Sequence, residues 1–156
     1  MYEKEFMEEA IRLSQKCLET GKGGPFGAVV VKDGEIVGRG NNSVTLNNDP
    51  TAHAEVMAIR DACKNLNTFQ LTNCEIYTSC EPCPMCLGAI YWARPKHVYY
   101  AANQEDAAKA GFDDSFIYDE IALDAAQRKI PATQHDREKA VVTFEKWVDC
   151  EQKIDY

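Results

Sequence analysis

The chain has 156 residues, 45% of them hydrophobic and 27% charged, which suits one globular domain with one hydrophobic core. No apolar stretch is long enough to cross a bilayer, so we expect no membrane-spanning helix. The net charge of −8 argues against nucleic acid as the main partner, because an acidic surface repels phosphate backbones.

An amphipathic helix is predicted at the N-terminal end, over residues 3–20. Phe6, Ala10 and Leu13 recur there at helical spacing. No basic segment followed by an apolar run occurs in this region, so we expect no signal peptide and a cytoplasmic location. The glycine-rich segment 21–27 ends the helix in a tight loop.

A β-hairpin is predicted next. Two β-rich runs, residues 28–31 and 36–37, flank Asp33-Gly34, and Asp-Gly in this setting is typical of a hairpin turn. The first run is apolar on both faces, which indicates a central strand. Residues 41–52 are rich in Asn, Thr, Asp and Pro and are predicted to form a loop.

Helices and strands alternate through the middle of the chain. We predict helices over residues 53–66 and 83–93, and strands over residues 74–79 and 97–101. This order predicts a three-layer α/β fold with a partly parallel sheet, formed by a single domain over residues 1–156.

The pattern weakens beyond residue 102. Residues 104–110 fit a short helix, residues 111–120 an ordered loop, and residues 138–152 a last amphipathic helix. We find no internal repeat, low-complexity segment or linker.

Seven cysteines are many for a chain of this length. Their odd number, without an export signal, argues against a secreted disulfide framework, so clustered cysteines indicate metal ligands or catalytic thiols. The seven are Cys17, Cys63, Cys74, Cys80, Cys83, Cys86 and Cys150.

Two short motifs supply the ligands that zinc prefers. The first is His-Ala-Glu, beginning at His53, and the second is Pro-Cys-Pro-Met-Cys, ending at Cys86. His53, Cys83 and Cys86 offer one imidazole and two thiolates for a tetrahedral Zn²⁺ site, with a fourth position left for water. Cys83 and Cys86 lie on one face of a helical turn, whereas His53 and Glu55 can converge only if His53 stands at the start of its helix.

Glu55 favours a catalytic site over a structural one. A structural zinc site has four protein ligands, whereas a free carboxylate such as Glu55 can take a proton from zinc-bound water and return it to the substrate. Cys80 as a fourth ligand and a redox Cys-x-x-Cys pair are the alternatives, although a redox pair leaves His53 and Glu55 unexplained. The two motifs together are the signature of zinc nucleobase deaminases.

Four stretches of sequence point to a family. They are residues 23–28 (GGPFGA), 48–55 (NDPTAHAE), 78–90 (TSCEPCPMCLGAI) and 110–118 (AGFDDSFIY). Through them the chain resembles the cytidine deaminase superfamily and, within it, the small bacterial guanine deaminases. The first three stretches are largely shared by tRNA adenosine deaminases, whereas the fourth and the C-terminal Tyr156 look specifically like guanine deaminase.

The resemblance implies a fold, an assembly and a reaction. It implies a three-layer α/β/α fold with a five-stranded mixed sheet, whose fifth strand would fall near residues 130–134. It also implies a homodimer that exchanges the C-terminal segment, about residues 130–156, so that each tail closes the partner's active site. The implied reaction is hydrolysis of guanine to xanthine and ammonia, in which a zinc-bound hydroxide attacks C2 and Glu55 protonates the adjacent ring nitrogen and then the leaving amine.

Four residues are candidates for binding the base. By resemblance Asn42 contacts the purine, and its amide can donate to O6 or N7, although turn-rich sequence also suits a plain turn residue. Phe26 can stack on the base or pack in the core. The Asp114 carboxylate can accept from N1–H and the exocyclic amine of guanine, and Tyr156 contributes only if the terminus reaches a site.

Three functions remain open from the sequence. The first is a guanine deaminase with a small nucleobase as substrate. The second is a tRNA adenosine deaminase, or another nucleobase or nucleoside deaminase of the superfamily; a tRNA enzyme should carry a basic surface, and this chain has a charge of −8. The third is a non-catalytic, zinc-stabilised binding module, which leaves Glu55 without a role.

Overall fold

The computed structural model describes all 156 residues, which divide into two compact units, Met1–Asp114 and Ser115–Tyr156. None of the helices is both long and apolar enough to span a membrane. The first unit contains α1 (Lys4–Ser14), α2 (Lys16–Thr20), β1 (Gly27–Lys32), β2 (Glu35–Asn41), α3 (Val44–Asn47), α4 (Ala54–Leu66), β3 (Glu75–Cys80), α5 (Pro84–Ala93), β4 (His97–Ala102) and α6 (Gln104–Lys109). The second contains α7 (Ser115–Ala122), the 3₁₀ helix η1 (Ala125–Gln127) and α8 (Arg137–Val148).

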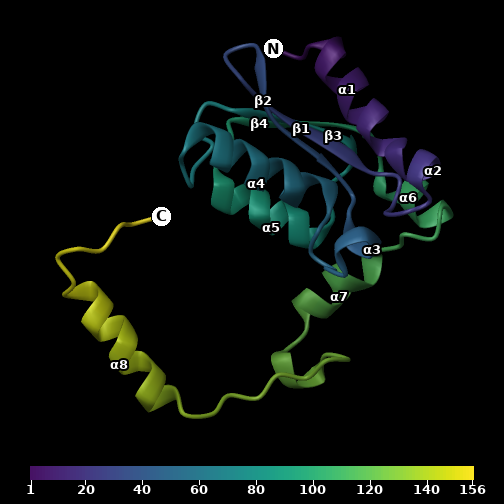
Figure 1. The fold of residues 1–156 in the computed structure, drawn as a ribbon. Coiled ribbons are helices and arrows are strands. Elements are labelled where there is room, and N and C mark those ends of the chain that lie inside the picture. The colour runs from purple at the N-terminus through teal and green to yellow at the C-terminus, as the bar shows by residue number, and fades with distance from the viewer. The chain divides into compact units, whose positions relative to one another are not determined.

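Four strands form one mixed sheet in the order β2-β1-β3-β4 (Figure 1). β1 pairs antiparallel with β2 and with β3, and β3 pairs parallel with β4. The predicted hairpin is confirmed: Asp33 and Gly34 connect β1 to β2 with φ values of 51° and 80°, the left-handed pair that a tight hairpin turn needs. The prediction of a central strand is also confirmed, since β1 has a neighbour on each side and Val29 and Val30 are fully buried.

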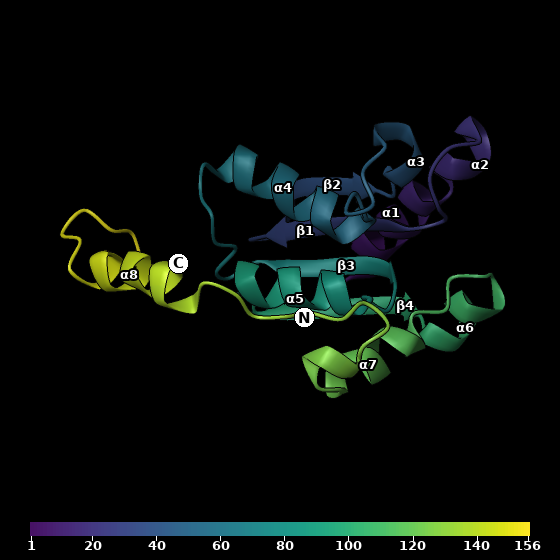
Figure 2. The same ribbon diagram turned by 90° about the horizontal axis from the view of Figure 1, so that it is seen from below.

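Helices cover both faces of the sheet, which gives the three layers that the sequence predicted (Figures 1 and 2). On one face, α1 packs Phe6 and Leu13 against Val31 of β1 and Tyr77 of β3. The helical spacing of the apolar residues in α1 thus produces a buried stripe that matches one side of the central strands.

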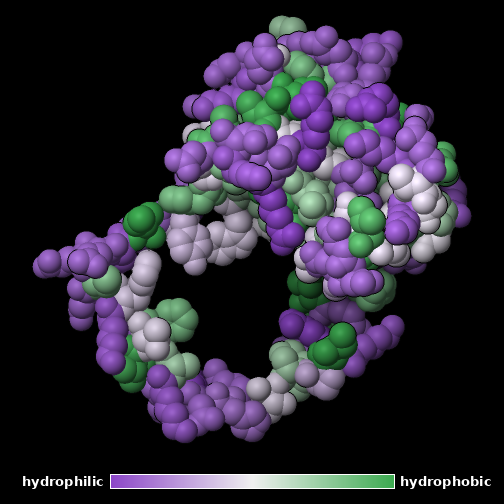
Figure 3. All heavy atoms as spheres, viewed as in Figure 1, coloured by the Kyte–Doolittle hydropathy of each residue, from purple (hydrophilic) through white to green (hydrophobic).

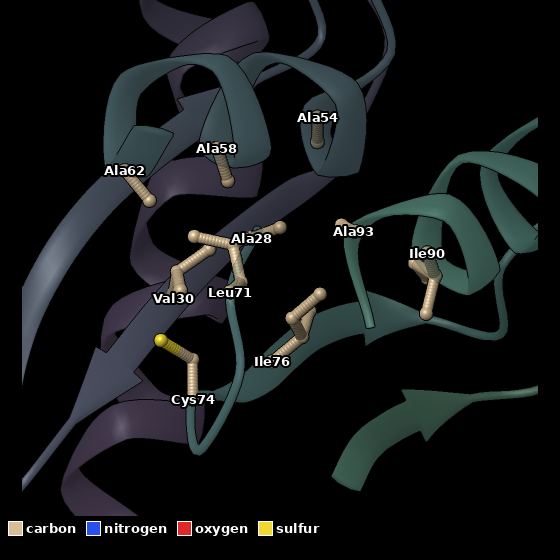
Figure 4. Packing of buried hydrophobic residues seen from close by; sticks show 10 residues of the cluster. All are labelled: Ala28, Val30, Ala54, Ala58, Ala62, Leu71, Cys74, Ile76, Ile90 and Ala93. Atoms are coloured by element: carbon tan, nitrogen blue, oxygen red, sulfur yellow. The ribbon is translucent and has the colours of Figure 1, made fainter. Parts of the chain in front are cut away.

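The other face of the sheet is covered by α4 and α5. Figure 4 shows the small side chains of α4, such as Ala58, pointing at Val30 on β1, with Ile90 of α5 in the same cluster. The close fit depends on β2, because a Cβ at Gly40 would overlap the carbonyl oxygen of Ala54. The start of α4 is therefore held directly against the end of β2.

Some predicted elements differ from those in the structure. The helix expected over residues 3–20 is interrupted at Gln15 and forms α1 and α2. The loop expected over residues 41–52 contains the short α3. The loop expected over residues 111–120 becomes helical at Ser115, where α7 begins, and the last helix ends at Val148 rather than near residue 152.

The sheet has four strands, and the fifth strand expected near residues 130–134 is not formed in the single chain. Residues 131–136 have neither helix nor strand. A strand needs a neighbour to pair its backbone N–H and C=O groups, and β4 is the last strand of the sheet, with one side unpaired.

The C-terminal unit buries little of its own apolar surface. None of the residues in α7 or α8 is buried, and Phe144 and Val148 on α8 are 71% and 67% exposed. Figure 3 shows hydrophobic residues at the surface of this unit beside hydrophilic ones. Its internal contacts include the 2.7 Å hydrogen bond from the Lys129 amide to Glu120.

Candidate metal centre and base-binding pocket

His53 stands at the boundary between a loop and a helix, as the sequence required. It is the N-cap of α4, with an extended backbone (φ −71°, ψ 156°), and its carbonyl accepts the first hydrogen bond of the helix from Met57 N at 2.9 Å. Because the helix begins only at Ala54, the side chains of His53 and Glu55 do not follow helical spacing. They can therefore face the same site, although they are only two residues apart.

Cys83 and Cys86 open α5 in a similar way. Cys83 is the N-cap, with φ −65° and ψ 167°, and Pro84 occupies the first helical position, where its missing N–H costs nothing. Cys86 lies one turn on and is buried. Both motifs thus bring their chemistry to the N-terminus of a helix, where unpaired N–H groups favour negatively charged ligands.

The three candidate ligands converge. The Nδ1 atom of His53 lies 3.5 Å from the sulfur of Cys83 and 3.5 Å from the sulfur of Cys86, and the three ligand atoms all lie within 4.8 Å of one another. Zinc bonds of about 2.3 Å to sulfur and about 2.0 Å to nitrogen at tetrahedral angles place the S and N atoms roughly 3.5 Å apart. The cluster therefore has the donor set and the spacing of a zinc site.

Hydrogen bonds within the cluster favour the charged forms of Cys83 and His53. Hydrogen bonding with Cys86, and further hydrogen bonding with His53, lowers the pKa of Cys83 to about 4. The hydrogen bond between His53 and Cys83 is also the main cause that raises the pKa of His53. Cys83 is thus favoured as a thiolate, the form in which cysteine binds a metal.

Glu55 lies beside the cluster, and Cys80 is not part of it. Glu55 is 5% exposed, and its Oε2 accepts a hydrogen bond from Cys86 Sγ at 3.4 Å. Burial raises the pKa of this carboxyl group. The Cys80 thiol points instead to the Asn103 carbonyl at 3.7 Å, so the cluster offers three protein ligands rather than four.

A pocket of about 520 Å³ opens beside the cluster. Of the base-binding candidates, it brings Phe26, Asn42 and Asp114 together with His53 and Glu55; Tyr156 belongs to the C-terminal unit. Four further lining residues were not singled out from the sequence. Glu81 and Asp113 lie within stretches that carry the family resemblance, whereas Thr45 and Gln104 have no local signal.

The Asn42 side chain is oriented so that its oxygen is bonded to the backbone and its amide nitrogen remains available as a donor. Its Oδ1 accepts hydrogen bonds from the backbone of Gly24 at 3.0 Å and Val44 at 3.3 Å. These two N–H donors identify the oxygen end of the side chain. Asn42 is 7% exposed, so its free Nδ2 donor belongs to a nearly enclosed wall of the pocket.

The Asp114 carboxyl group interacts electrostatically with Cys83 of the metal cluster. Burial is the main cause that raises the pKa of Asp114, and the negative charge of Cys83 adds to it. A carboxylate held there would gain from N–H donors on a ligand, since charge-assisted hydrogen bonds offset the cost of burial.

The site and the fold define the family. The cytidine and deoxycytidylate deaminase zinc-binding region matches residues 1–102. The chain belongs to this family, and its zinc-binding residues are His53, Cys83 and Cys86.

Within the family, the chain is similar along its whole length to a guanine deaminase from Bacillus subtilis. The two are 56% identical over 156 residues, which is 100% of each sequence. The crystal structure of that enzyme superposes with a TM-score of 0.96, covering 100% of this chain and 99% of the other.

Two further relatives match only part of the chain. A guanine deaminase structure from Nitrosomonas europaea is 33% identical with a TM-score of 0.66, over 70% of this chain and 63% of the other. A tRNA-specific adenosine deaminase from Aquifex aeolicus is 44% identical over 97 residues, which is 62% of this chain and 64% of the relative.

Proposed function

We propose that this chain hydrolyses guanine to xanthine and ammonia. The observation that carries the proposal is a likeness to a guanine deaminase that extends over the whole chain. The cluster of His53, Cys83 and Cys86, with Glu55 buried beside it, supports the same function. The likeness to the tRNA-specific adenosine deaminase from Aquifex aeolicus covers only 97 residues. The function is thus that of a hydrolase acting on an exocyclic C–N bond of the base.

Glu55 is the proton carrier in this proposal. Zinc, when bound, lowers the pKa of a coordinated water towards about 7. As the water oxygen bonds to C2 of guanine, Glu55 accepts the proton that the water loses and passes it to the adjacent ring nitrogen. Glu55 then takes the second proton of the former water from the new C2 hydroxyl group and delivers it to the amine. The amine leaves as ammonia as the exocyclic C2–N bond breaks and the C2 carbonyl of xanthine forms. The raised pKa of this buried carboxyl group suits a group that must both take up and release a proton.

Three residues hold the base in the pocket. The Nδ2 group of Asn42 donates to O6 or N7 of the purine, since its Oδ1 is already bonded to backbone N–H groups. Asp114 accepts from N1–H and the exocyclic amine, a donor pair that adenine does not offer. Phe26 lines the same pocket and offers a ring for stacking.

The proposed assembly is a homodimer with exchanged C-terminal segments. The outer edge of β4 is unpaired, and residues 130–134 of a second copy would complete a fifth strand there. The exposed apolar residues of α8 support a partner that covers them. Tyr156 of each chain would then close the pocket of the other. This assembly, the single domain over residues 1–156 and a cytoplasmic location stay predictions.

A substrate panel tests the proposed activity. Ammonia release from the zinc-loaded protein would be measured with guanine, cytosine, adenine, their nucleosides and a tRNA anticodon stem-loop containing adenosine. We expect guanine to be the best substrate, with the ultraviolet spectrum changing to that of xanthine. A faster reaction on the stem-loop would favour the tRNA enzyme, and no turnover on any substrate would favour a binding module.

A further inference from the structure

Two phenylalanines from distant parts of the chain meet in the pocket wall. Phe26 belongs to the glycine-rich loop before β1, and Phe112 to the segment after α6. Their ring centroids are 4.9 Å apart with an interplanar angle of 85°, an edge-to-face geometry that aromatic rings favour. Both residues line the pocket.

The ring of Phe26 is a fixed surface. A Cβ at Gly24 would lie 3.2 Å from two of its ring carbons, so the ring lies directly against the Gly24 backbone. Its amide donates to the Gly24 carbonyl at 2.8 Å, and its carbonyl accepts from the Asn42 amide at 3.0 Å. The strand ends that place Asn42 therefore also place Phe26.

Phe112 connects that fixed surface to the segment that carries Asp114. Its amide donates to the Ala107 carbonyl of α6 at 3.0 Å, just after a turn at Gly111 with φ 91°. Asp114 follows two residues later, and residues 112–114 form neither helix nor strand. The Phe112 ring thus anchors a segment that has no regular structure to hold it.

We propose that Phe112 is a positioning residue, whose contact with Phe26 holds Asp114 at the depth in the pocket where it meets the base. This inference rests on the proposed function, in which Asp114 accepts hydrogen bonds from guanine. Phe112 is 44% exposed and so contributes little to the core. Its contact with Phe26 therefore contributes more to holding the pocket wall in place than to the stability of the fold.

Two variants and a control test the inference without any turnover. Amide hydrogen exchange would be measured in the full-length, zinc-loaded protein for Phe112→Ala, Phe112→Tyr and Phe69→Ala. Phe69 is also an exposed aromatic residue, 55% accessible, but it does not line the pocket. We expect Phe112→Ala to speed exchange at residues 111–114 about two- to tenfold, the loss expected for one edge-to-face pair. The other two variants should leave exchange there unchanged, and unchanged exchange in Phe112→Ala would overturn the inference.

Kinetics then test whether Phe112 acts through Asp114. Phe112→Ala should raise KM for guanine about two- to tenfold with little change in kcat. The reason is that the weakened contact, between Asp114 and guanine, is made equally in the bound state and in the transition state. Phe112→Tyr should restore KM. In an Asp114→Asn background, Phe112→Ala should have almost no further effect, because the two residues act as one unit.

The outcomes separate this inference from the proposed function. Fully additive effects of Phe112→Ala and Asp114→Asn on KM would overturn the positioning role while the guanine activity stands. A wild-type protein that leaves guanine unchanged would contradict the proposed function, and the exchange result would still decide whether Phe112 orders residues 111–114.

Discussion

Burial separates Glu55 from the other acidic side chains around it. Glu55 is 5% exposed and contacts Cys86, one of the zinc-binding residues, whereas Glu81 and Asp114 are only partly buried in the same pocket. A buried carboxyl group binds its proton more tightly, because water no longer stabilises the charged form. The residue next to the metal is thus the one best suited to exchange protons with the substrate.

Replacing Glu55 should separate metal binding from turnover. We expect Glu55→Ala to retain zinc, because His53, Cys83 and Cys86 remain, and to lower kcat by about 10²- to 10⁴-fold, the usual contribution of a general acid–base group. Zinc content by elemental analysis and xanthine formation by absorbance would be measured side by side. Glu105→Ala, which removes an exposed carboxylate outside the pocket, is the control. Wild-type activity in Glu55→Ala would remove this residue from the mechanism.

The helix α4 is the element that places this chemistry. Its first residue follows His53 directly, and its small side chains let it approach the sheet closely. Gly38 and Gly40 of β2 make that approach possible, because a Cβ at either position would overlap the α4 backbone. A shift of the helix at Gly40 would move the end that carries Glu55.

Gly40→Ala should therefore damage stability and activity together. Overpacking of this kind costs about 1–3 kcal/mol, and the displaced α4 should lower kcat as well as the melting temperature. Thermal unfolding and guanine turnover would be measured for this variant and for Gly88→Ala. Gly88 lies in α5 with open space around it, so an alanine there should be neutral or stabilise by about 0.5–1 kcal/mol. Equal melting temperatures for the two variants would contradict the expected clash between a side chain at position 40 and the backbone of α4.

At the scale of the whole molecule, the chain consists of two units of different character. The unit Met1–Asp114 has a buried core and contains the zinc-binding residues. The unit Ser115–Tyr156 has exposed apolar side chains and no buried residue in its α-helices. Such a surface is costly in water and favours coverage by a partner.

Removal of residues 153–156 should abolish most activity while changing stability little. These residues are mostly exposed, so their loss removes few packing contacts, whereas the proposed role of Tyr156 in a partner's pocket would be lost. Turnover and melting temperature of the shortened chain would be compared with those of the full chain. Wild-type turnover in the shortened chain would contradict the exchanged tail.

A mixing experiment tests whether the tail acts in its own chain or in a partner. The shortened chain and full-length Glu55→Ala are each expected to be inactive alone. If tails are exchanged, a mixed dimer has one pocket with both an intact Glu55 and an intact tail, and random mixing restores about a quarter of wild-type activity. No regained activity after dissociation and reassociation would show that the tail does not serve a second chain.

The sequence by itself determined the ligands of the metal and most of the first unit. His53, Cys83 and Cys86 were identifiable because zinc ligation needs particular side chains at short spacings, and Asp33-Gly34 because few residues accept a left-handed turn. Periodicity likewise indicated the helices and strands of the sheet, since each has one face in contact with a core.

The tertiary structure alone decided the rest. Phe112 meets Phe26, and Asn42 turns its oxygen to Gly24, through contacts between segments far apart in the chain, which no local pattern encodes. The helix that begins at Ser115 was missed because its apolar residues find no core that would give them a clear period. The fifth strand was not formed for a related reason: a strand exists only where another strand pairs with it, and residues 131–134 have no strand partner in the structure.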